Sequence, residues 1–225
     1  MIPSQQSFDW YDIKLKDAIN TPSAEELAGL CVDQPTLDNI YCANIDRASD
    51  TGYISGYFVQ PQNVANFRTA GADFKLNYNF NTAKVGAFNI QLAGGYLHKL
   101  EFIPTPGADV DVDRLETYFP KWNVTGDITW KMDALTINYG ISWFSKTRRY
   151  TTEELGGNPD IADPKYFWFK EKWQHDLYVA YDVDERFRFY VGANNLFDQQ
   201  PDIASTNYPV SFVGRYMYAG AKITM

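Results

Sequence analysis

The most restrictive feature of this sequence is an alternation of apolar and polar residues that persists over unusually long segments. Residues 72–80 read ADFKLNYNF, so every second residue is apolar and the residues between them are Asp, Lys or Asn. The same alternation runs through residues 88–92, 124–132, 135–143 and 177–183. Successive side chains of a β-strand point to opposite faces, so this pattern predicts strands with one apolar and one polar face.

About eight long strands are predicted from this alternation. Their expected ranges are 7–17, 53–80 with a bend near Pro61, 86–104, 117–132, 134–150, 166–183, 186–196 and 212–225. Many of these ranges are at least twice the usual strand length of about 5–6 residues, as membrane-spanning strands are. One helix is expected in the first long connection, where Ser23 and Glu26 have the spacing of a capping box in the segment SAEELAGL.

The connections between these strands alternate in length. Short connections are expected at 81–85, 132–134 and 183–185, whereas those at 18–52, 105–116, 151–165 and 197–211 are long. Short turns at one end and long loops at the other are typical of outer-membrane barrels. The predicted fold is therefore all-β: an antiparallel transmembrane β-barrel segment of about eight strands with short periplasmic turns and long extracellular loops.

Composition agrees with this fold and excludes some functions. Aromatic residues make up 16% of the chain although the mean hydropathy is only −0.39, and membrane barrels place such rings in girdles at both lipid–water boundaries. An aromatic-rich soluble β-sandwich, such as a lectin, remains an alternative. The net charge of −8 argues against a nucleic-acid partner, because such binding depends on Lys and Arg at phosphates.

The sequence shows no hydrophobic targeting segment. No stretch approaches about 18 consecutive apolar residues, which a transmembrane helix requires. Residues 1–10, MIPSQQSFDW, lack the charged and apolar regions of a signal peptide. If the protein is exported, we expect its signal to lie outside this sequence, which would make the chain a fragment.

The two cysteines, Cys31 and Cys42, lie eleven residues apart in a polar segment. They can close a small disulfide in an oxidising compartment, or they can be two unrelated reduced thiols. We expect the disulfide, because the segment offers little core in which to bury either thiol.

Residues 185–225 resemble the C-terminal end of TonB-dependent outer-membrane receptors. In that family the penultimate strand ends in N-N-L-F-D-x-x-P and the last strand begins with G-R-x-Y-x-x-G. The matching residues are Asn194, Asn195, Leu196, Phe197, Asp198 and Pro201, followed by Gly214, Arg215, Tyr216, Tyr218 and Gly220. Upstream, Asn63, Arg68, Thr69, Gly71 and Asp73 resemble a further strand motif of the family, and the segments WYDIKLKDAI and NIYC are also similar to members.

The resemblance implies that residues 1–225 are the C-terminal portion of a receptor barrel. Such receptors have a 22-stranded barrel closed by a plug, so the plug domain and the earlier strands would be absent. The implied function is active uptake of a scarce ligand (a siderophore, cobalamin, an oligosaccharide or similar) across a Gram-negative-type outer membrane. The implied partners are outer-membrane lipid, the barrel-assembly machinery, and a TonB-type energy-transducing system that acts through the plug. A small stand-alone outer-membrane barrel with a structural or adhesive role is the alternative.

The signature is expected to be architectural, not reactive. Asn and Asp favour turns, Leu196 and Phe197 can pack on the barrel rim, and Pro201 is expected to end the strand pairing. No nucleophile–base arrangement is visible, so no enzyme, catalytic residue or cofactor is predicted. His98 and His175 lie far apart in sequence, and Arg114 follows the acidic segment DVDVD (109–113) where a calcium loop requires Gly, so no metal site is expected.

Four cations near the extracellular strand ends are weak candidates for ligand contact: Lys146, Arg148, Lys170 and Lys172. Pairing with carboxylates in the barrel lumen is the more favoured reading of these residues. The two strand registers are expected to face different solvents. The residues expected to face lipid are Phe74, Leu76, Tyr78, Phe88, Ile90, Leu92, Ile128, Trp130, Ile137, Tyr139, Ile141, Leu177, Val179 and Phe189. Those expected to face the lumen are Asp73, Lys75, Asn77, Asp127, Thr129, Asn138, Asp176 and Arg188.

Overall fold

The computed structural model describes residues 4–104, 106, 108–202 and 209–224. Strands form most of its regular structure. They are β1 (Ser4–Asn20), β2 (Ile45–Arg47), β3 (Ile54–Tyr57), β4 (Gln62–Thr82), β5 (Gly86–Ile103), β6 (Trp122–Met132), β7 (Leu135–Phe144), β8 (Thr147–Arg148), β9 (Trp168–Phe169), β10 (Lys172–Asp182), β11 (Phe187–Asn194) and β12 (Tyr216–Ile223). The helices are α1 (Ala24–Val32), α2 (Thr152–Gly157) and the short 3₁₀ helices Cys42–Asn44 and Pro164–Tyr166.

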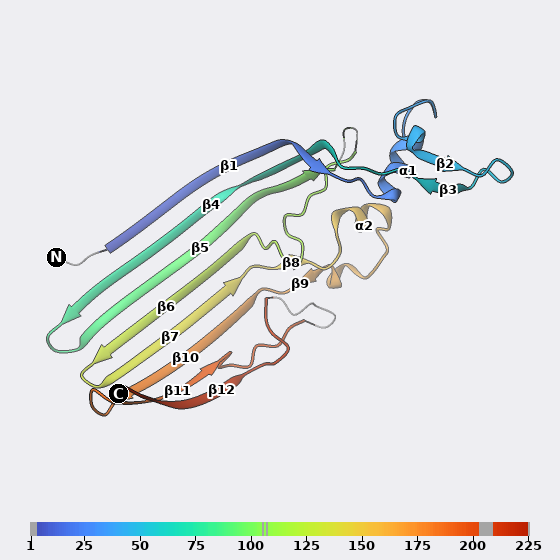
Figure 1. Cartoon of the computed structure of the whole chain (residues 1–225). Helices are drawn as coiled ribbons and strands as arrows, with labels where there is room; N and C mark the ends of the chain where they lie inside the picture. The colour runs from blue at the N-terminus through green and yellow to red at the C-terminus, as the bar shows by residue number, and fades with distance from the viewer. Residues whose placement is uncertain (1–3, 105, 107, 203–208, 225) are drawn as a thin grey trace. The chain divides into compact units, whose positions relative to one another are not determined.

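Eight of the strands form a single sheet in the order β1-β4-β5-β6-β7-β10-β11-β12 (Figure 1). Short connections at 83–85, 133–134 and 183–186 join neighbouring strands at one end. Long connections leave the other end, at 21–61, 104–121, 145–171 and 195–215. The eight-stranded antiparallel sheet and the alternation of short and long connections confirm the fold predicted from the sequence.

Several predicted strand limits are wrong. The predicted bent strand 53–80 is interrupted at 58–61, so that β3 pairs with β2 in a separate small sheet. The predicted strands 134–150 and 166–183 continue only as the two-residue ribbon β8–β9 beyond the main sheet. Strand β6 begins at Trp122 instead of 117, and β12 spans 216–223; residue 225 lies outside the described residues. Apolar residues beyond the strand ends continue the alternating sequence pattern past the last paired backbone groups, so these strands were predicted too long.

Helix α2 was not predicted. Thr151 accepts a hydrogen bond from the Glu154 backbone N–H at 3.1 Å, and the Glu154 carboxylate accepts one from the Thr151 N–H at 2.8 Å. This reciprocal pair is a capping box, the signal that predicted α1, where Ser23 and Glu26 make the same two bonds. The segment TTEE therefore carried a readable helix signal. None of the helices among the described residues is long and apolar enough to cross a membrane.

The cross-strand register places the two predicted sets of side chains on opposite faces. Residues directly opposite each other in an antiparallel pair share a face. On one face Ile90 is opposite Ile128, Ile128 is opposite Tyr139, and Tyr139 is opposite Leu177. On the other face Gln91 is opposite Asp127, Thr129 is opposite Asn138, and Asp182 is opposite Arg188. We call these the apolar face and the polar face.

Aromatic rings gather at both ends of the apolar face. At the long-loop end Tyr96 lies 4.6 Å from Trp122, and Trp143 lies 5.6 Å from Trp173, between ring centroids. At the short-turn end Phe88 lies 4.7 Å from Phe80 and 6.5 Å from Trp130. Eight residues separate Trp122 from Trp130, or about 26 Å along a strand. Barrel strands are tilted by about 35–45°, so this spacing is about 20 Å of height, comparable with the apolar band of about 25 Å between the two interface girdles of an outer-membrane barrel.

The chain forms two compact units. The first contains Met1–Tyr11, Ala70–His98 and Arg114–Met225, and the second contains Asp12–Thr69 and Lys99–Asp113. Within the second unit, residues 21–60 form what we call the disulfide lobe, which holds α1 and the β2–β3 pair. Leu27, Leu30, Cys31 and Ile45 form the small core of this lobe.

Candidate functional site

The residues of the predicted family signature converge at the long-loop ends of β11 and β12. We call residues 195–202 together with 214–215 the signature junction. Asn195 is buried and has a φ of 53°, a left-handed conformation that Asn tolerates better than most residues. Its side chain accepts a hydrogen bond from the Gln199 N–H at 2.7 Å and donates one to the Gln199 carbonyl at 2.9 Å. The Asn195 side chain thus takes the place of a strand partner, and pairing ends at Asn194, well before Pro201.

Asp198 connects this turn to the start of the last strand. Its carboxylate accepts a hydrogen bond from the Arg215 N–H at 2.8 Å. Gly214 has a φ of 70°, and a Cβ there would lie 2.7 Å from Asp198 Oδ1. Only glycine allows both this conformation and this close approach. The N-N-L-F-D and G-R elements are therefore two halves of one hydrogen-bonded unit.

The junction is anchored to the sheet through β10. The Asn195 N–H donates to Asp176 Oδ1 at 2.7 Å, and the Leu196 N–H donates to the His175 carbonyl at 2.6 Å. Phe197 contacts the His175 ring edge-on at 5.0 Å. These contacts fix where the long 195–215 connection leaves the sheet.

Glycine and tyrosine interlock on the polar face beside the junction. The rings of Tyr178 and Tyr190 lie 5.9 Å apart, and those of Tyr190 and Tyr218 lie 6.4 Å apart. Tyr190 covers Gly220, where an added Cβ would lie 2.4 Å from the phenolic oxygen, and Tyr218 covers Gly192 in the same way. The signature residue Gly220 is thus required by packing, and the tyrosines form an aromatic surface on the polar face.

Lys172 is a predicted ligand candidate that the structure places in an internal ion pair. Its side chain is buried, and its Nζ lies 3.1 Å from Asp202 Oδ1 and 3.1 Å from the Gln200 carbonyl. The second oxygen of Asp202 accepts the Lys170 backbone N–H at 2.8 Å. Asp202 therefore ties the signature junction to the start of β10. Asp202 was not among the predicted site residues, although it follows Pro201 directly.

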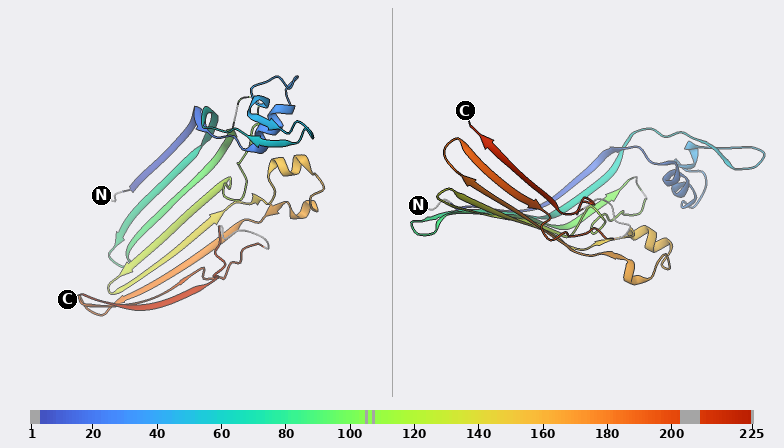
Figure 2. Two further views of the ribbon diagram at one scale, coloured as in Figure 1. Left: turned by 45° about the vertical axis from the view of Figure 1, so that its right-hand side comes forward. Right: turned by 90° about the horizontal axis from the view of Figure 1, so that it is seen from below.

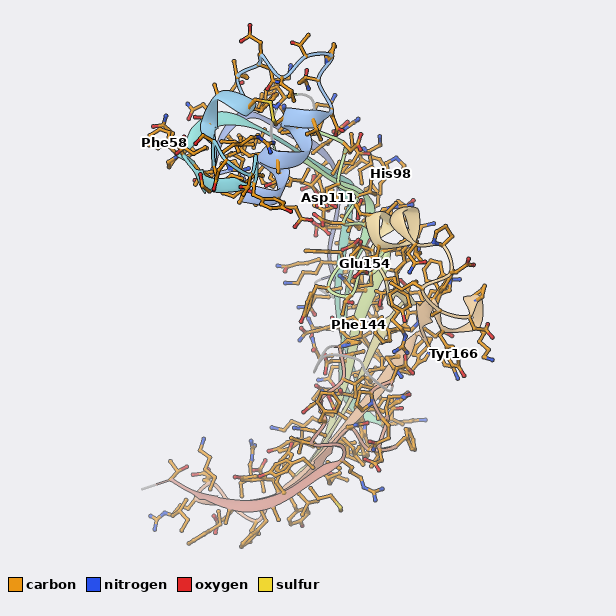
Figure 3. All side chains as sticks on the ribbon, turned by 90° about the vertical axis from the view of Figure 1, so that its right-hand side faces the viewer. Phe58, His98, Asp111, Phe144, Glu154 and Tyr166 are labelled. Atoms are coloured by element: carbon orange, nitrogen blue, oxygen red, sulfur yellow. A yellow bond between two sulfur atoms is a disulfide. The ribbon has the colours of Figure 1, made fainter. Side chains whose placement is uncertain are left out.

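Lys146 and Arg148 lie at the ribbon formed by β8 and β9. Lys146 is exposed and its Nζ lies 4.4 Å from the centroid of the Trp168 ring, while the Arg148 guanidinium lies 5.9 Å from the same ring. Arg148 also donates to Thr152 Oγ1 at the start of α2. Figure 3 labels Glu154 on α2 and Tyr166 next to β9. We call Lys146, Arg148, Trp168 and the exposed Lys170 the cationic ribbon.

Neutral amides cover the polar face toward the short turns. Asn89 Nδ2 donates to Asn77 Oδ1 at 2.9 Å and to Asn79 Oδ1 at 2.5 Å, and Gln91 Nε2 donates to Asn89 Oδ1 at 2.9 Å. Asn138 donates to Thr129 Oγ1 at 2.9 Å on the same face. Such a surface is suited to water or to a polar polypeptide, and it carries no reactive group.

The disulfide lobe contains the predicted bond between Cys31 and Cys42, with an S–S distance of 2.11 Å. The bond is confirmed, but the reason given for it is wrong for Cys31, which is only 1% exposed and belongs to the small core of the lobe. Asn39 Nδ2 donates to the Cys31 carbonyl at 3.1 Å and contacts Cys42 Sγ at 3.2 Å. The lobe carries six carboxylates and one arginine, a net charge of −5 out of −8 for the chain.

Among the described residues, no group of three or more His, Cys, Asp or Glu side chains is arranged to hold a metal ion. In the acidic segment 109–113, Asp111 pairs through its backbone with Phe102, at 2.8 Å and 2.9 Å. Besides the signature junction, the geometry provides three distinct surfaces: the cationic ribbon, the tyrosine surface and the polar face. Together with the apolar face and its two aromatic girdles, these surfaces are those of a sheet from a membrane β-barrel.

Comparison with known proteins places this sheet in a family. The model of the TonB dependent receptor-like β-barrel matches residues 4–196. The chain therefore belongs to the TonB-dependent receptor-like β-barrel family. This family consists of outer-membrane receptors and transporters, not enzymes, that work with a TonB system. No curated protein sequence matches the chain significantly.

Solved structures support the fold. A mutant of the ferric enterobactin receptor PfeA from Pseudomonas aeruginosa aligns over 98% of this chain and 29% of that protein, with 13% identity and a TM-score of 0.59. The P. aeruginosa receptor FpvA bound to heterologous pyoverdines aligns over 97% of this chain and 24% of that protein, with 14% identity and a TM-score of 0.55. The chain thus spans less than a third of the length of these structures.

Proposed function

We propose that this chain is the C-terminal barrel portion of a TonB-dependent receptor that takes up a scarce small ligand across the outer membrane. The observation that carries the proposal is the register of the sheet, which gathers apolar side chains and two aromatic girdles on one face. The match to the family over residues 4–196 supports the same assignment. The plug and the energy supplied by the TonB system belong to the complete receptor.

The stand-alone barrel is disfavoured by the edges of the sheet. The edge strand β1 has 17 residues, whereas β12 at the other edge has 8. Pairing these two strands with each other would leave without partners about half of the β1 backbone groups that point away from β4. In lipid each such group costs several kcal/mol. Pairing of β1 with a strand of similar length elsewhere in the receptor removes this cost.

The membrane assignment is tested by cysteine accessibility at two neighbouring positions. Ile137 lies on the apolar face opposite Val179, and Asn138 lies on the polar face opposite Tyr178. In an Asn138→Cys variant, water-soluble thiol reagents should label the thiol. In an Ile137→Cys variant, lipid-borne probes should reach the thiol and water-soluble reagents should not. Equal labelling of both positions by both reagents would contradict the barrel orientation.

We further propose that the ligand is anionic and contacts the cationic ribbon. Lys146 and Lys170 are exposed, and Arg148 faces Trp168, so a ligand can approach both charge and an aromatic ring. Lys172 is assigned a structural role, because Asp202 already neutralises it. Ferric siderophores are a suitable first ligand class, because they are named for the similar structures PfeA and FpvA.

Ferric enterobactin and a ferric pyoverdine serve as probes in a binding measurement that follows tryptophan fluorescence. The double variant Lys146→Gln/Arg148→Gln should bind the correct probe about tenfold more weakly, since one charge-assisted hydrogen bond contributes at least about 1.5 kcal/mol. Lys222→Gln, at the short-turn end, is the matched control and should bind normally. Equal affinity of the double variant and the wild type would reject the ribbon as the ligand site.

A further inference from the structure

The apolar face has a groove over β10, β11 and β12, which run side by side in both views of Figure 2. Its volume is about 460 Å³, within the range of small-molecule pockets. The side chains that border it are Leu177, Val179, Val191, Ala193, Met217 and Ala219. All six belong to the register of the apolar face, since Leu177 is opposite Ala193, Ala193 is opposite Met217, and Val191 is opposite Ala219.

The groove exists because small and large side chains alternate diagonally across the register. Ala193 and Ala219 leave space between the longer side chains of Leu177, Val191 and Met217. Val191 and Met217 remain 55% and 72% exposed, so the sheet itself does not fill this space. Across the register Met217 aligns with Ile128, between Trp122 and Trp130, and Val191 aligns with Trp130 itself. The exposed apolar walls therefore lie within the band that the girdles bound, which indicates a hydrocarbon environment.

One end of the groove is polar and cationic. Leu196 borders the groove at the long-loop end, and its carbonyl accepts a hydrogen bond from Arg215 Nη1 at 3.4 Å. Within the described residues the Arg215 guanidinium has no ion pair. The nearby Asp198 carboxylate is engaged by the Arg215 backbone N–H. On the same face the Tyr139 hydroxyl and His175 Nδ1 are 2.6 Å apart.

We propose that this groove binds an acyl chain of a membrane lipid whose phosphate headgroup contacts Arg215. The groove runs along β11 from Val191 to Leu196, just beyond the end of the strand, and Arg215 lies at this end. An apolar tail joined to an anionic head is the chemistry that fits both parts. The orientation rests on the proposed membrane function, which places the long-loop end at an interface where lipid headgroups lie.

Spin-labelled lipids in vesicles provide the test. The protein purified from outer membranes is reconstituted with either spin-labelled phosphatidic acid or spin-labelled phosphatidylcholine, and electron paramagnetic resonance measures the motionally restricted fraction. The wild type should prefer phosphatidic acid about fivefold, since one Arg near anionic lipid contributes about that factor. Arg215→Gln should abolish the preference, and Arg186→Gln, an exposed arginine in the short turn between β10 and β11, should retain it.

A second pair of variants tests the groove itself. Ala219→Trp and the milder Ala219→Leu fill the groove and should lower the restricted fraction of phosphatidic acid, whereas Ala221→Trp and Ala221→Leu, on the same face opposite Phe189, should not. Equal lipid selectivity of Arg215→Gln and Arg186→Gln would overturn the proposal. It would also be overturned if the wild type forms a dimer that the Ala219 variants lose, because the groove would then hold a second copy of the chain. Absence of any restricted lipid around the wild type would reject the membrane function as well.

Discussion

The disulfide lobe and the signature junction both form beyond the ends of the long strands, but different interactions hold them in order. In the lobe, one covalent bond and the four core residues Leu27, Leu30, Cys31 and Ile45 support about forty residues. In the junction, the side chains of Asn195 and Asp202 each make two hydrogen bonds to backbone or to a buried charge, and the Asp198 side chain makes one to the Arg215 N–H. No disulfide is present there.

The difference follows from what each region can pack against. The junction is tied to β10 through Asp176, His175 and Lys172. Its polar groups are therefore partly shielded from water, and their hydrogen bonds contribute more to stability than exposed ones. The lobe buries few of its apolar residues and carries most of the excess negative charge of the chain. A segment with so small a core needs a covalent constraint to stay folded. Four predictions test this difference between a region held by a disulfide and a region held by hydrogen bonds, beginning with the largest expected effect.

Asp202→Asn should destabilise the junction most. The change leaves the buried Lys172 ammonium without a counter-charge, and breaking such a pair costs about 3–5 kcal/mol. Urea titration of the reconstituted protein measures the free energy of unfolding, and limited proteolysis locates the cleavage within 195–215. The control is Lys172→Met/Asp202→Leu, which removes both charges and should restore most of the lost stability. Equal stability of Asp202→Asn and the wild type would show that the pair is not needed.

Cys31→Ala/Cys42→Ala should loosen the lobe and leave the junction unchanged. Closing a loop of this length stabilises by up to about 3 kcal/mol, mainly by restricting the unfolded segment. Proteolysis within 21–60 should become faster, with no new cleavage in 195–215. Intact-mass measurement with and without reductant confirms the bond in the wild type. Two freely alkylated thiols in unreduced exported protein would show that the lobe is not held by a disulfide.

Asn195→Ala should cost about 2–3 kcal/mol, because it removes two hydrogen bonds to Gln199 and replaces Asn with a residue that tolerates a left-handed φ less well. Asn195→Gly isolates the hydrogen-bond part, since glycine adopts that φ freely and should be about 1 kcal/mol more stable than the Ala variant. Both values come from the same urea titration. If the Gly variant is no more stable than the Ala variant, the backbone at residue 195 of the Ala variant has left the left-handed conformation.

The smallest expected effect is the pH dependence of the stability of the loop before β9. The Lys165 side chain and, secondly, the Lys165 backbone N–H lower the pKa of Asp163 below its ordinary value of 3.8. A depressed pKa in the folded protein stabilises this turn above pH 3.8 and loses that contribution as the pH falls through the folded pKa. The amide resonance of Lys165, followed by NMR, should therefore titrate below pH 3.8. Lys165→Gln should raise the midpoint, and an unchanged midpoint would exclude the ion pair.

The sequence by itself determined the class of fold, the two faces and the family. Alternation such as that of residues 72–80 depends only on the strand period of two, and the register of β5, β6, β7, β10 and β11 confirmed it for the predicted residues on these strands. The α1 helix and the disulfide were also local enough to read, through Ser23, Glu26 and a short cysteine spacing.

Only the tertiary structure decided how the strand ends are completed. Lys172 is in sequence one more cation near a strand end, and its role depends on Asp202, thirty residues away. The break between β3 and β4 and the groove over β11 and β12 depend on which strands pair, because Ala193 and Ala219 form a common hollow only when Leu177 and Met217 flank them. Local periodicity carries no information on such long-range neighbours, since the chain must first fold to bring them together.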